Sequence, residues 1–164
     1  MQLTYEPAMS RPDLLAEPVR AALVAWPDAA EVLVAGIDPA LADTAAMSQA
    51  YDVPMAAGAN CVIVSGRRDG EERVAACMVR ADTRADVNNV VKRLLDVRKA
   101  SFHPMERAVE ESAMEYGGIT PVGLPATWRL FVDARVVDID LACIIIGRGP
   151  GCCSLLATLT SRIV

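Results

Sequence analysis

The sequence predicts an α+β fold built on a mixed β-sheet, and two observations support this class. Asp69-Gly70 separates two segments rich in β-branched residues, which is a typical signal of an antiparallel hairpin. The other helical and strand-like segments do not alternate as regularly as a doubly wound parallel sheet requires. Because 53% of the 164 residues are hydrophobic, we expect a single domain over residues 1–164 with a sizeable core.

The first part of the chain predicts an arm, a helix and a strand. Residues 1–10 are expected to form a loose arm. Apolar residues recur at near-helical spacing over residues 11–26, with Pro18 at the first helical position, where no backbone N–H is needed. The run EVLVAGI, residues 31–37, predicts a strand. The arm and helix, residues 1–29, therefore precede the first strand.

A second helix and the hairpin follow. Asp38-Pro39 predicts the N-cap and first turn of a helix that reaches about Tyr51. Strands are predicted over residues 60–67 and 72–80, on either side of the Asp69-Gly70 turn. These two strands are expected to pair with each other.

The middle of the chain predicts two helices and a short strand between them. Thr83 is expected to cap an amphipathic helix. The apolar stripe of that helix consists of Val87, Val90, Val91, Leu94 and Leu95. Residues 99–102 predict a short strand, and Pro104 predicts the start of the next helix.

The last third predicts a loop and two buried strands. Three glycines and two prolines fall between Tyr116 and Pro125, a composition typical of a loop. Buried strands are predicted over residues 128–133 and 141–147. The segment GRGPG, residues 147–151, is expected to break the chain before a short return and a polar tail.

Charge and composition exclude several classes of function. With 16 Lys and Arg against 21 Asp and Glu, the net charge is −5, so a polycationic nucleic-acid binder is excluded, although a local basic groove is not. Aromatic residues are only 4% of the chain, which makes a stacking platform of several aromatics hard to build. The start of the chain has no signal-peptide pattern, and the longest apolar run, Leu141 to Ile146, is too short to span a bilayer. We expect a cytoplasmic protein with no membrane partner.

Cysteine and histidine usage predicts neither a metal site nor a cofactor. The five cysteines include no CxxC pair, and His103 is the single histidine, so the spacing of a zinc site is missing. Cys61 is either a small core residue or, with a lowered pKa, a nucleophile. His103 is either a residue at the start of a helix or a general base.

The loop segment GGITP, Gly117 to Pro121, is the most informative motif. Its two glycines permit positive φ or close approach of a ligand to the backbone. The motif has two interpretations: a tight structural turn, or a nest of backbone N–H donors for a carbonyl or an oxyanion. It lacks the GK[ST] ending of a phosphate-binding loop.

This loop, followed by a strand that ends in Val132-Asp133, resembles the GxxxP loop of the YbaK/EbsC family. These proteins are free-standing relatives of the editing domain of bacterial prolyl-tRNA synthetases. The segment ADTAA, residues 42–46, is similar to the family helix that leads into the active-site strand, here residues 60–64. Residues 84–102 resemble the following helix and strand. The resemblance covers roughly residues 30–147 and is weak after residue 148.

The resemblance implies a fold and an activity. The fold is a mixed sheet, curled into a partial barrel, with helices packed around it. The activity is hydrolysis in trans of the ester of a mischarged tRNA that carries a small amino acid, such as alanine, serine, threonine or cysteine. Water would attack the ester with help from the 2′-hydroxyl of the substrate itself. The catalytic residues that the resemblance implies are Gly117, Gly118, Thr120, Pro121 and Asn60.

Within the loop, Gly117 to Pro121 would hold the aminoacyl carbonyl and the terminal ribose, and Thr120 would donate a side-chain hydrogen bond. A second set of residues is expected to contact the substrate. The expected substrate-binding residues are Ile119, Cys61, Thr44, Gly147, Arg148, Ser154, Lys99, Arg98 and Arg80.

Asn60 stands where the family has a lysine, and this is a departure from the family pattern. An asparagine donates hydrogen bonds but carries no charge. Losing a charge-assisted bond would reduce transition-state stabilisation by about 2–4 kcal/mol. Three explanations remain open. Another cation, such as Lys99, Arg98 or Arg80, reaches the same space; the lysine is dispensable for this substrate; or the protein binds without hydrolysing.

The partner that follows from this interpretation is the acceptor end of a misacylated tRNA, and DNA is not expected. Arg80, Arg84, Arg98 and Lys99 are candidates for phosphate contacts, although such pairs are also typical of a solvated surface. Because the net charge is −5, we expect modest affinity for tRNA alone and delivery by a synthetase or an elongation factor. The alternatives are a catalytically weakened module that binds an aminoacyl ester or tRNA end, and a small-molecule or nucleotide binder on the same fold.

Overall fold

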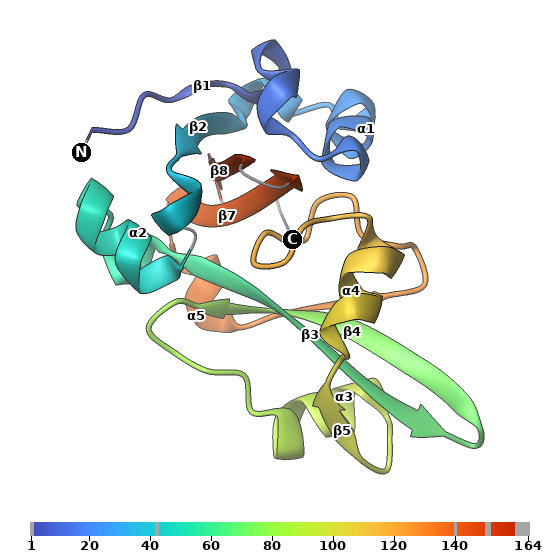
Figure 1. Cartoon of the computed structure of the whole chain (residues 1–164). Coiled ribbons are helices and arrows are strands. Elements are labelled where there is room, and N and C mark those ends of the chain that lie inside the picture. Colours follow the sequence, from blue (N-terminus) through green and yellow to red (C-terminus); the bar gives the residue numbers. More distant parts are fainter. Residues whose placement is uncertain (1, 42, 140, 150–151, 160–164) are drawn as a thin grey trace.

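Two four-stranded sheets form the framework of the protein. The computed structural model describes residues 2–41, 43–139, 141–149 and 152–159, and in the last two ranges Ile144 is the one residue whose side chain is described. The first sheet has the order β1-β2-β8-β7 and the second the order β5-β3-β4-β6. Figure 1 shows helices around both sheets, which confirms the α+β class.

The first sheet is antiparallel throughout. Its strands are β1 (Glu6–Pro7), β2 (Leu33–Ile37), β8 (Cys152–Leu159) and β7 (Leu141–Gly149). The second sheet is mixed, because β4 pairs in parallel with β6, whereas β3 pairs antiparallel with both β4 and β5. Its strands are β5 (Ala100–Phe102), β3 (Ala59–Arg68), β4 (Glu71–Arg80) and β6 (Arg129–Val132). The predicted mixed sheet is confirmed, and the described strands form two open sheets that do not close into a barrel.

The helices are short. They are α1 (Glu17–Ala25), α2 (Thr44–Tyr51), α3 (Lys92–Leu95), α4 (Met105–Ser112) and α5 (Ala134–Val137), with single turns η1 to η6. The turns are η1 (Ala8–Ser10), η2 (Pro12–Leu14), η3 (Ala29–Glu31), η4 (Pro39–Leu41), η5 (Met55–Ala57) and the π-helical η6 (Val87–Val91). No helix in the described ranges is both long and apolar enough to cross a membrane.

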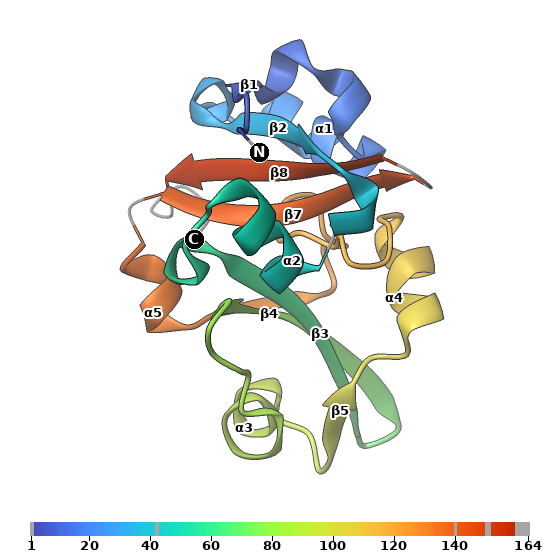
Figure 2. The ribbon, with the colours of Figure 1, turned by 60° about the vertical axis from the view of Figure 1, so that its left-hand side comes forward.

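Two layers of side chains cover the faces of β3, because alternate residues of a strand point to opposite sides. Val64 packs with Val91 and Leu95 of the η6–α3 segment. Ile63 packs on the other face with Ala108 of α4. In Figure 2 the first sheet lies above β3 and β4, and α3 lies below them. Ile144 of β7 joins Ala59 of β3 in one buried cluster, which links the two sheets.

Several predicted elements are confirmed. A proline occupies the first turn of α1, as expected for Pro18. Asp69 and Gly70 both have positive φ, 52° and 86°, as the hairpin turn requires. The strand at residues 99–102 and the helix after Pro104 are present as β5 and α4.

The predicted loose arm is wrong. Glu6 and Pro7 pair with β2, and Ala8 is fully buried. The break predicted at residues 147–151 begins later than expected, because β7 runs on to Gly149, and the predicted short return is the strand β8, which starts at Cys152 and lies between β2 and β7. The apolar run CCSLLATL was a strand signal that the glycines before it obscured.

The two predicted helix caps differ from the structure. The helix predicted from Asp38 is divided: Asp38 accepts a hydrogen bond from the backbone N of Ala40 in the turn η4, whereas α2 is capped by Asp43, whose Oδ1 accepts from the backbone N of Ala45 and Ala46. Asp86, not Thr83, caps the next helical segment. That segment is a π turn followed by a short α-helix, so the periodic stripe is only partly buried. Val90 and Leu94 are exposed.

The strand predicted at residues 128–133 is present as β6, but it is not buried. Arg129 and Leu130 are exposed, and the next two residues are half-buried. The cause is its place at the edge of the second sheet, where only β4 pairs with it.

Candidate functional site

A cleft of about 950 Å³ lies between α2, β3, α4 and the loop after α4. This volume exceeds that of a small amino acid and is typical of a pocket for a larger organic ligand. Side chains and backbone of 19 residues line it: Pro39, Ala40, Asp43, Thr44, Ala59, Asn60, Cys61, Val62, Ile63, Phe102, His103, Met105, Ala108, Val109, Glu115, Tyr116, Gly117, Ile119 and Ile144. Of the predicted site residues, Thr44, Asn60, Cys61, Gly117 and Ile119 are among them.

Thr44 and Asn60 form the polar side of the cleft. Thr44 is the first residue of α2, and Asn60 lies near the start of β3. The Oγ1 hydroxyl of Thr44 donates a 2.9 Å hydrogen bond to Oδ1 of Asn60. Because Thr44 occupies the amide oxygen, Asn60 has its NH₂ group left to donate to a ligand.

The loop after α4 presents a turn to the cleft. The N–H of Gly118 donates to the carbonyl of Glu115 across 3.0 Å, and Gly117 has a φ of +76°. A closed turn with positive φ at its third residue is a type II turn, which favours glycine there. A Cβ on Gly117 would meet nothing within 4 Å, so this position needs glycine for its backbone conformation and not for space.

The loop therefore has fewer free backbone N–H donors than a nest for a carbonyl or an oxyanion would require. The N–H of Gly118 closes the turn, and the backbone N of Thr120 lies 3.5 Å from the sulfur of Met114. Thr120 is fully buried, and its hydroxyl has no hydrogen-bond partner among the described residues. Gly118, Thr120 and Pro121 do not line the cleft, so they shape the loop from behind.

Gly123 is a further requirement of this loop that the sequence analysis missed. Its φ is +82°, and a Cβ there would lie 2.4 Å from the carbonyl oxygen of Pro18. The loop backbone thus packs directly against the start of α1. Only the absence of a side chain permits this contact.

Cys61 and His103 also line the cleft. Burial, together with the nearby Cys77, raises the pKa of the Cys61 thiol to about 12, so the thiol is protonated at neutral pH and is a poor nucleophile. The His103 side chain is fully buried with its ring edge-on to Trp128 at 5.9 Å. Its Nε2 lies 3.5 Å from Oε1 of Glu111 without a well-formed hydrogen bond.

The predicted cations do not reach the cleft. Arg80 forms an ion pair with Asp82 at 2.6 Å, and Arg98 and Lys99 are exposed in the turn before β5. Within the described part of the chain, no Lys or Arg lines the cleft, whereas Asp43 and Glu115 do. The described lining is therefore neutral to acidic.

Three further predicted residues lie on the first sheet. Gly147 and Arg148 are in β7, and Ser154 is in β8, where it pairs with Gly36 and Ile146. The side chains of Arg148 and Ser154 lie outside the described residues. Across the described ranges, no group of three or more His, Cys, Asp or Glu residues could hold a metal ion.

Comparison with known proteins decides the family. Residues 38–149, more than half of the chain, match the model of the aminoacyl-tRNA editing domain. The chain belongs to this family. The YbaK-like resemblance is thereby confirmed, and the match places the protein in aminoacyl-tRNA editing. All the cleft-lining residues lie within the matched range.

Solved structures share the editing-domain fold. A crystal structure of a proposed trans-editing enzyme for prolyl-tRNA synthetase superposes with a TM-score of 0.71 at 16% identity, over 91% of this chain and 90% of that chain. A scaffold from work on computational grafting of epitope backbones gives 0.70 at 16% identity, over 90% and 89%. A hypothetical protein gives 0.62 at 23% identity, over 75% and 77%. Curated proteins offer no match to the sequence.

Proposed function

We propose that this editing-domain protein is an aminoacyl-tRNA deacylase that acts in trans and removes a small amino acid from a mischarged tRNA. The observation that carries the proposal is the cleft beside Asn60 and the Gly117 turn, inside the region that matches the editing family. Its volume of about 950 Å³ accommodates an amino acid together with the terminal nucleoside that bears it. A pocket for a free small amino acid would need far less space.

The proposed reaction is hydrolysis of the ester bond. Water attacks the ester carbonyl, the bond between that carbon and the ribose oxygen breaks, and the free amino acid and an uncharged tRNA leave. The NH₂ group of Asn60 would hydrogen-bond the developing negative charge on the carbonyl oxygen. One well-placed neutral donor of this kind contributes about 10²- to 10³-fold in rate. The substrate's 2′-hydroxyl supplies the assistance that a strong protein base would otherwise provide.

The expected residues of the cleft wall and the loop, and the expected cations, each have a place in this proposal. Thr44 orients Asn60, while Gly117 and Ile119 contact the substrate at the loop. Gly118, Thr120 and Pro121 hold the loop in its turn. Cys61 forms part of the wall as a protonated thiol. Phosphate contacts by Arg80, Arg98 and Lys99 would have to lie outside the cleft, on the path of the acceptor stem.

The experiment that tests the proposal is a deacylation assay. The purified protein is mixed with tRNAs charged with alanine, serine, threonine, cysteine or proline, and the loss of each ester is followed over time. The control is Gly118→Pro, which removes the N–H that closes the turn at Glu115, checked for folding by its thermal melt. We expect hydrolysis of one or two small amino acids by the wild type and little by the control. If a folded wild-type sample hydrolyses none of them, the proposal is wrong.

A second candidate, binding without hydrolysis, is favoured by one observation: no cation lines the described part of the cleft. Asn60→Lys separates the two candidates. If the wild type is inactive and Asn60→Lys gains activity, the protein is a binding module. If the wild type is already active, the neutral donor suffices. Delivery by a synthetase or an elongation factor would appear as faster deacylation when that protein is added.

A further inference from the structure

We propose that Phe102 and Tyr116 form a subsite in which the 3′-terminal base of the tRNA stacks. The inference rests on the proposed function, since the ligand is the end of an aminoacyl-tRNA. It adds a contact between the protein and the terminal base, and this contact holds the tRNA end in the cleft. The scarcity of aromatic residues in the sequence had argued against stacking.

Exposure sets these two residues apart from the other aromatics. Phe102 is 68% exposed and Tyr116 is 70% exposed, whereas the next most exposed aromatic, Tyr5, is 37% exposed. They are also the most exposed of all the large hydrophobic side chains in the described ranges. Leaving an aromatic side chain in water forgoes the stabilisation that its burial would give, so paired exposure at one place is typical of a binding surface.

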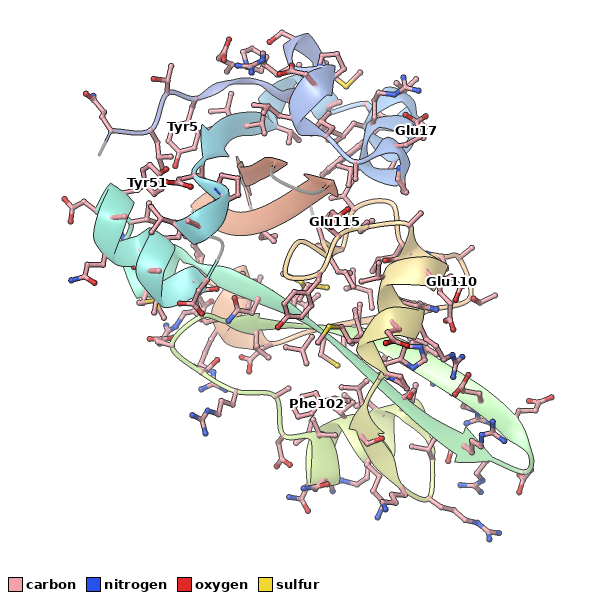
Figure 3. All side chains as sticks on the ribbon, in the orientation of Figure 1. Tyr5, Glu17, Tyr51, Phe102, Glu110 and Glu115 are labelled. Carbon is pink, nitrogen blue, oxygen red and sulfur yellow. The ribbon has the colours of Figure 1, made fainter. Side chains whose placement is uncertain are left out.

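Both residues line the same cleft, although they come from different elements. Phe102 ends β5, an edge strand for which β3 is the one pairing partner among the described strands. Tyr116 is the second residue of the type II turn that Gly118 closes on Glu115. Met105, in the first turn of α4, is a third exposed apolar residue among the lining residues. Figure 3 shows Phe102 beside β5 and Glu115, the neighbour of Tyr116, in the loop after α4.

The cleft therefore has a polar side and an apolar side. Thr44, Asn60 and Asp43 supply the polar groups, and Phe102, Met105 and Tyr116 supply exposed apolar surface. An aminoacyl-adenosine has the same two-part character: an ester with an amino group at one end and a flat base at the other. Single-stranded RNA ends are commonly held by stacking of unpaired bases on aromatic side chains.

Charge favours stacking over phosphate contacts as the anchor. The protein carries a net charge of −5, and the described cleft lining includes Asp43 and Glu115 but no Lys or Arg. Attraction of the phosphates into this cleft is therefore weak. Stacking does not depend on the sign of the protein's charge, so it can retain the tRNA end where electrostatics does not.

The test uses RNA without an ester, so it is independent of hydrolysis. A short single-stranded RNA ending in CCA and labelled at its 5′ end is compared, by fluorescence anisotropy, with the same RNA whose terminal base has been removed. Wild-type protein should bind the intact RNA at least about fivefold more tightly, because one stacked base contributes about 1–3 kcal/mol. Phe102→Leu and Tyr116→Leu should abolish most of this difference, whereas Tyr116→Trp should retain it. Tyr5→Leu, a change at an aromatic that does not line the cleft, should leave it unchanged.

Equal affinity of the wild type for the two RNAs, or no measurable affinity for either, would overturn the subsite. A difference that survives both leucine substitutions would overturn it as well. These outcomes are distinct from failure of the proposed function. A protein that hydrolyses the ester without dependence on the base loses only this inference, and one that binds the base without hydrolysing loses only the enzymatic proposal.

Discussion

The Oγ1 hydroxyl of Thr44 donates a hydrogen bond to Oδ1 of Asn60 across 2.9 Å, and this bond joins the start of α2 to β3. The family resemblance implies a lysine at position 60, and with a neutral amide there instead, this bond leaves the NH₂ group as the end that can donate. A lysine needs no such partner to present its donors, because all three of its N–H groups are equivalent.

In the proposed function Thr44 positions Asn60, so Thr44→Val should lower kcat/KM for deacylation by about fivefold to tenfold, since one neutral hydrogen bond contributes about 1 kcal/mol. Thr44→Ser keeps the hydroxyl and should restore most of the activity. The measurement is kcat and KM for both variants on the same charged tRNA. Equal loss in Thr44→Ser and Thr44→Val would show that the hydroxyl does not orient Asn60.

The hydroxyl group of Thr120 should prove dispensable for the fold and for activity. Its hydroxyl is buried without a partner among the described residues, and Thr120→Val replaces it with an apolar group of similar shape. Because a buried unpaired polar group is destabilising, the variant should gain about 1 kcal/mol in its free energy of unfolding. Urea denaturation measures this change, and deacylation should stay within about twofold of the wild type. A large loss of activity would indicate that the hydroxyl contacts the substrate or an ordered water.

Cys61 should not react as a nucleophile. Burial raises the pKa of its thiol to about 12, so the thiolate is scarce at neutral pH. Folded protein treated with iodoacetamide at pH 7.5 should show no label on the Cys61 peptide by mass spectrometry, while denatured protein should be labelled. Cys61→Ala should keep its deacylation activity. Rapid labelling of Cys61 in the native state would contradict this account.

An acid-dependent contribution to stability is expected from Asp96, which lies in the turn between α3 and β5. Hydrogen bonding from Arg73, followed by the charge of Arg68, lowers the pKa of the Asp96 carboxyl below 3.8. A carboxylate with a lowered pKa stabilises the folded state above its unfolded pKa, and the contribution is lost as the pH falls through the folded pKa.

Asp96→Asn isolates this contribution, because asparagine tolerates the positive φ of 55° at this position. Urea denaturation of both proteins from pH 7 down to about pH 2 gives the difference in free energy of unfolding. The difference should be constant near neutral pH and should shrink in the acid range. A difference that does not vary with pH would show that the ion pairs with Arg68 and Arg73 contribute nothing.

Salt should affect binding of the tRNA end only weakly. A groove in which Arg80, Arg84, Arg98 and Lys99 each neutralised a phosphate would give a slope of about −3 for log K against log salt with single-stranded RNA. Stacking in a cleft without described cations predicts a slope between 0 and about −1. Anisotropy titrations with the CCA-ending RNA at several salt concentrations measure it. A slope near −3 would favour the basic groove instead.

Local chemistry made part of the fold predictable. The Asp69-Gly70 turn, the proline in the first turn of α1 and the proline before α4 act within a few residues, and the structure has each element where the sequence placed it. The central position of β8 was not predictable in the same way. It depends on pairing with β2, more than 100 residues earlier in the chain, and no local pattern reports that contact.

The candidate site was likewise predictable only in part from the sequence. The Gly117 turn could be read from glycine spacing, and Asn60 and Thr44 from the family resemblance. The stacking pair could not, because the composition gives the number of aromatics and not their location. Five of the seven aromatics are less exposed, and the other two line one cleft. The sequence also could not predict that the described lining lacks a cation. Arg98 and Lys99 are close to β5 in the sequence, but they do not line the cleft.

The most direct test of the central claim is the rate at which purified wild-type protein removes the amino acid from its preferred mischarged tRNA, compared with Asn60→Ala and with spontaneous hydrolysis. If the neutral amide is the working donor, the wild type should exceed the spontaneous rate clearly, and Asn60→Ala should lose about 10²-fold or more of that enhancement. A wild-type rate equal to the spontaneous rate, or full activity in a folded Asn60→Ala variant, would contradict the account.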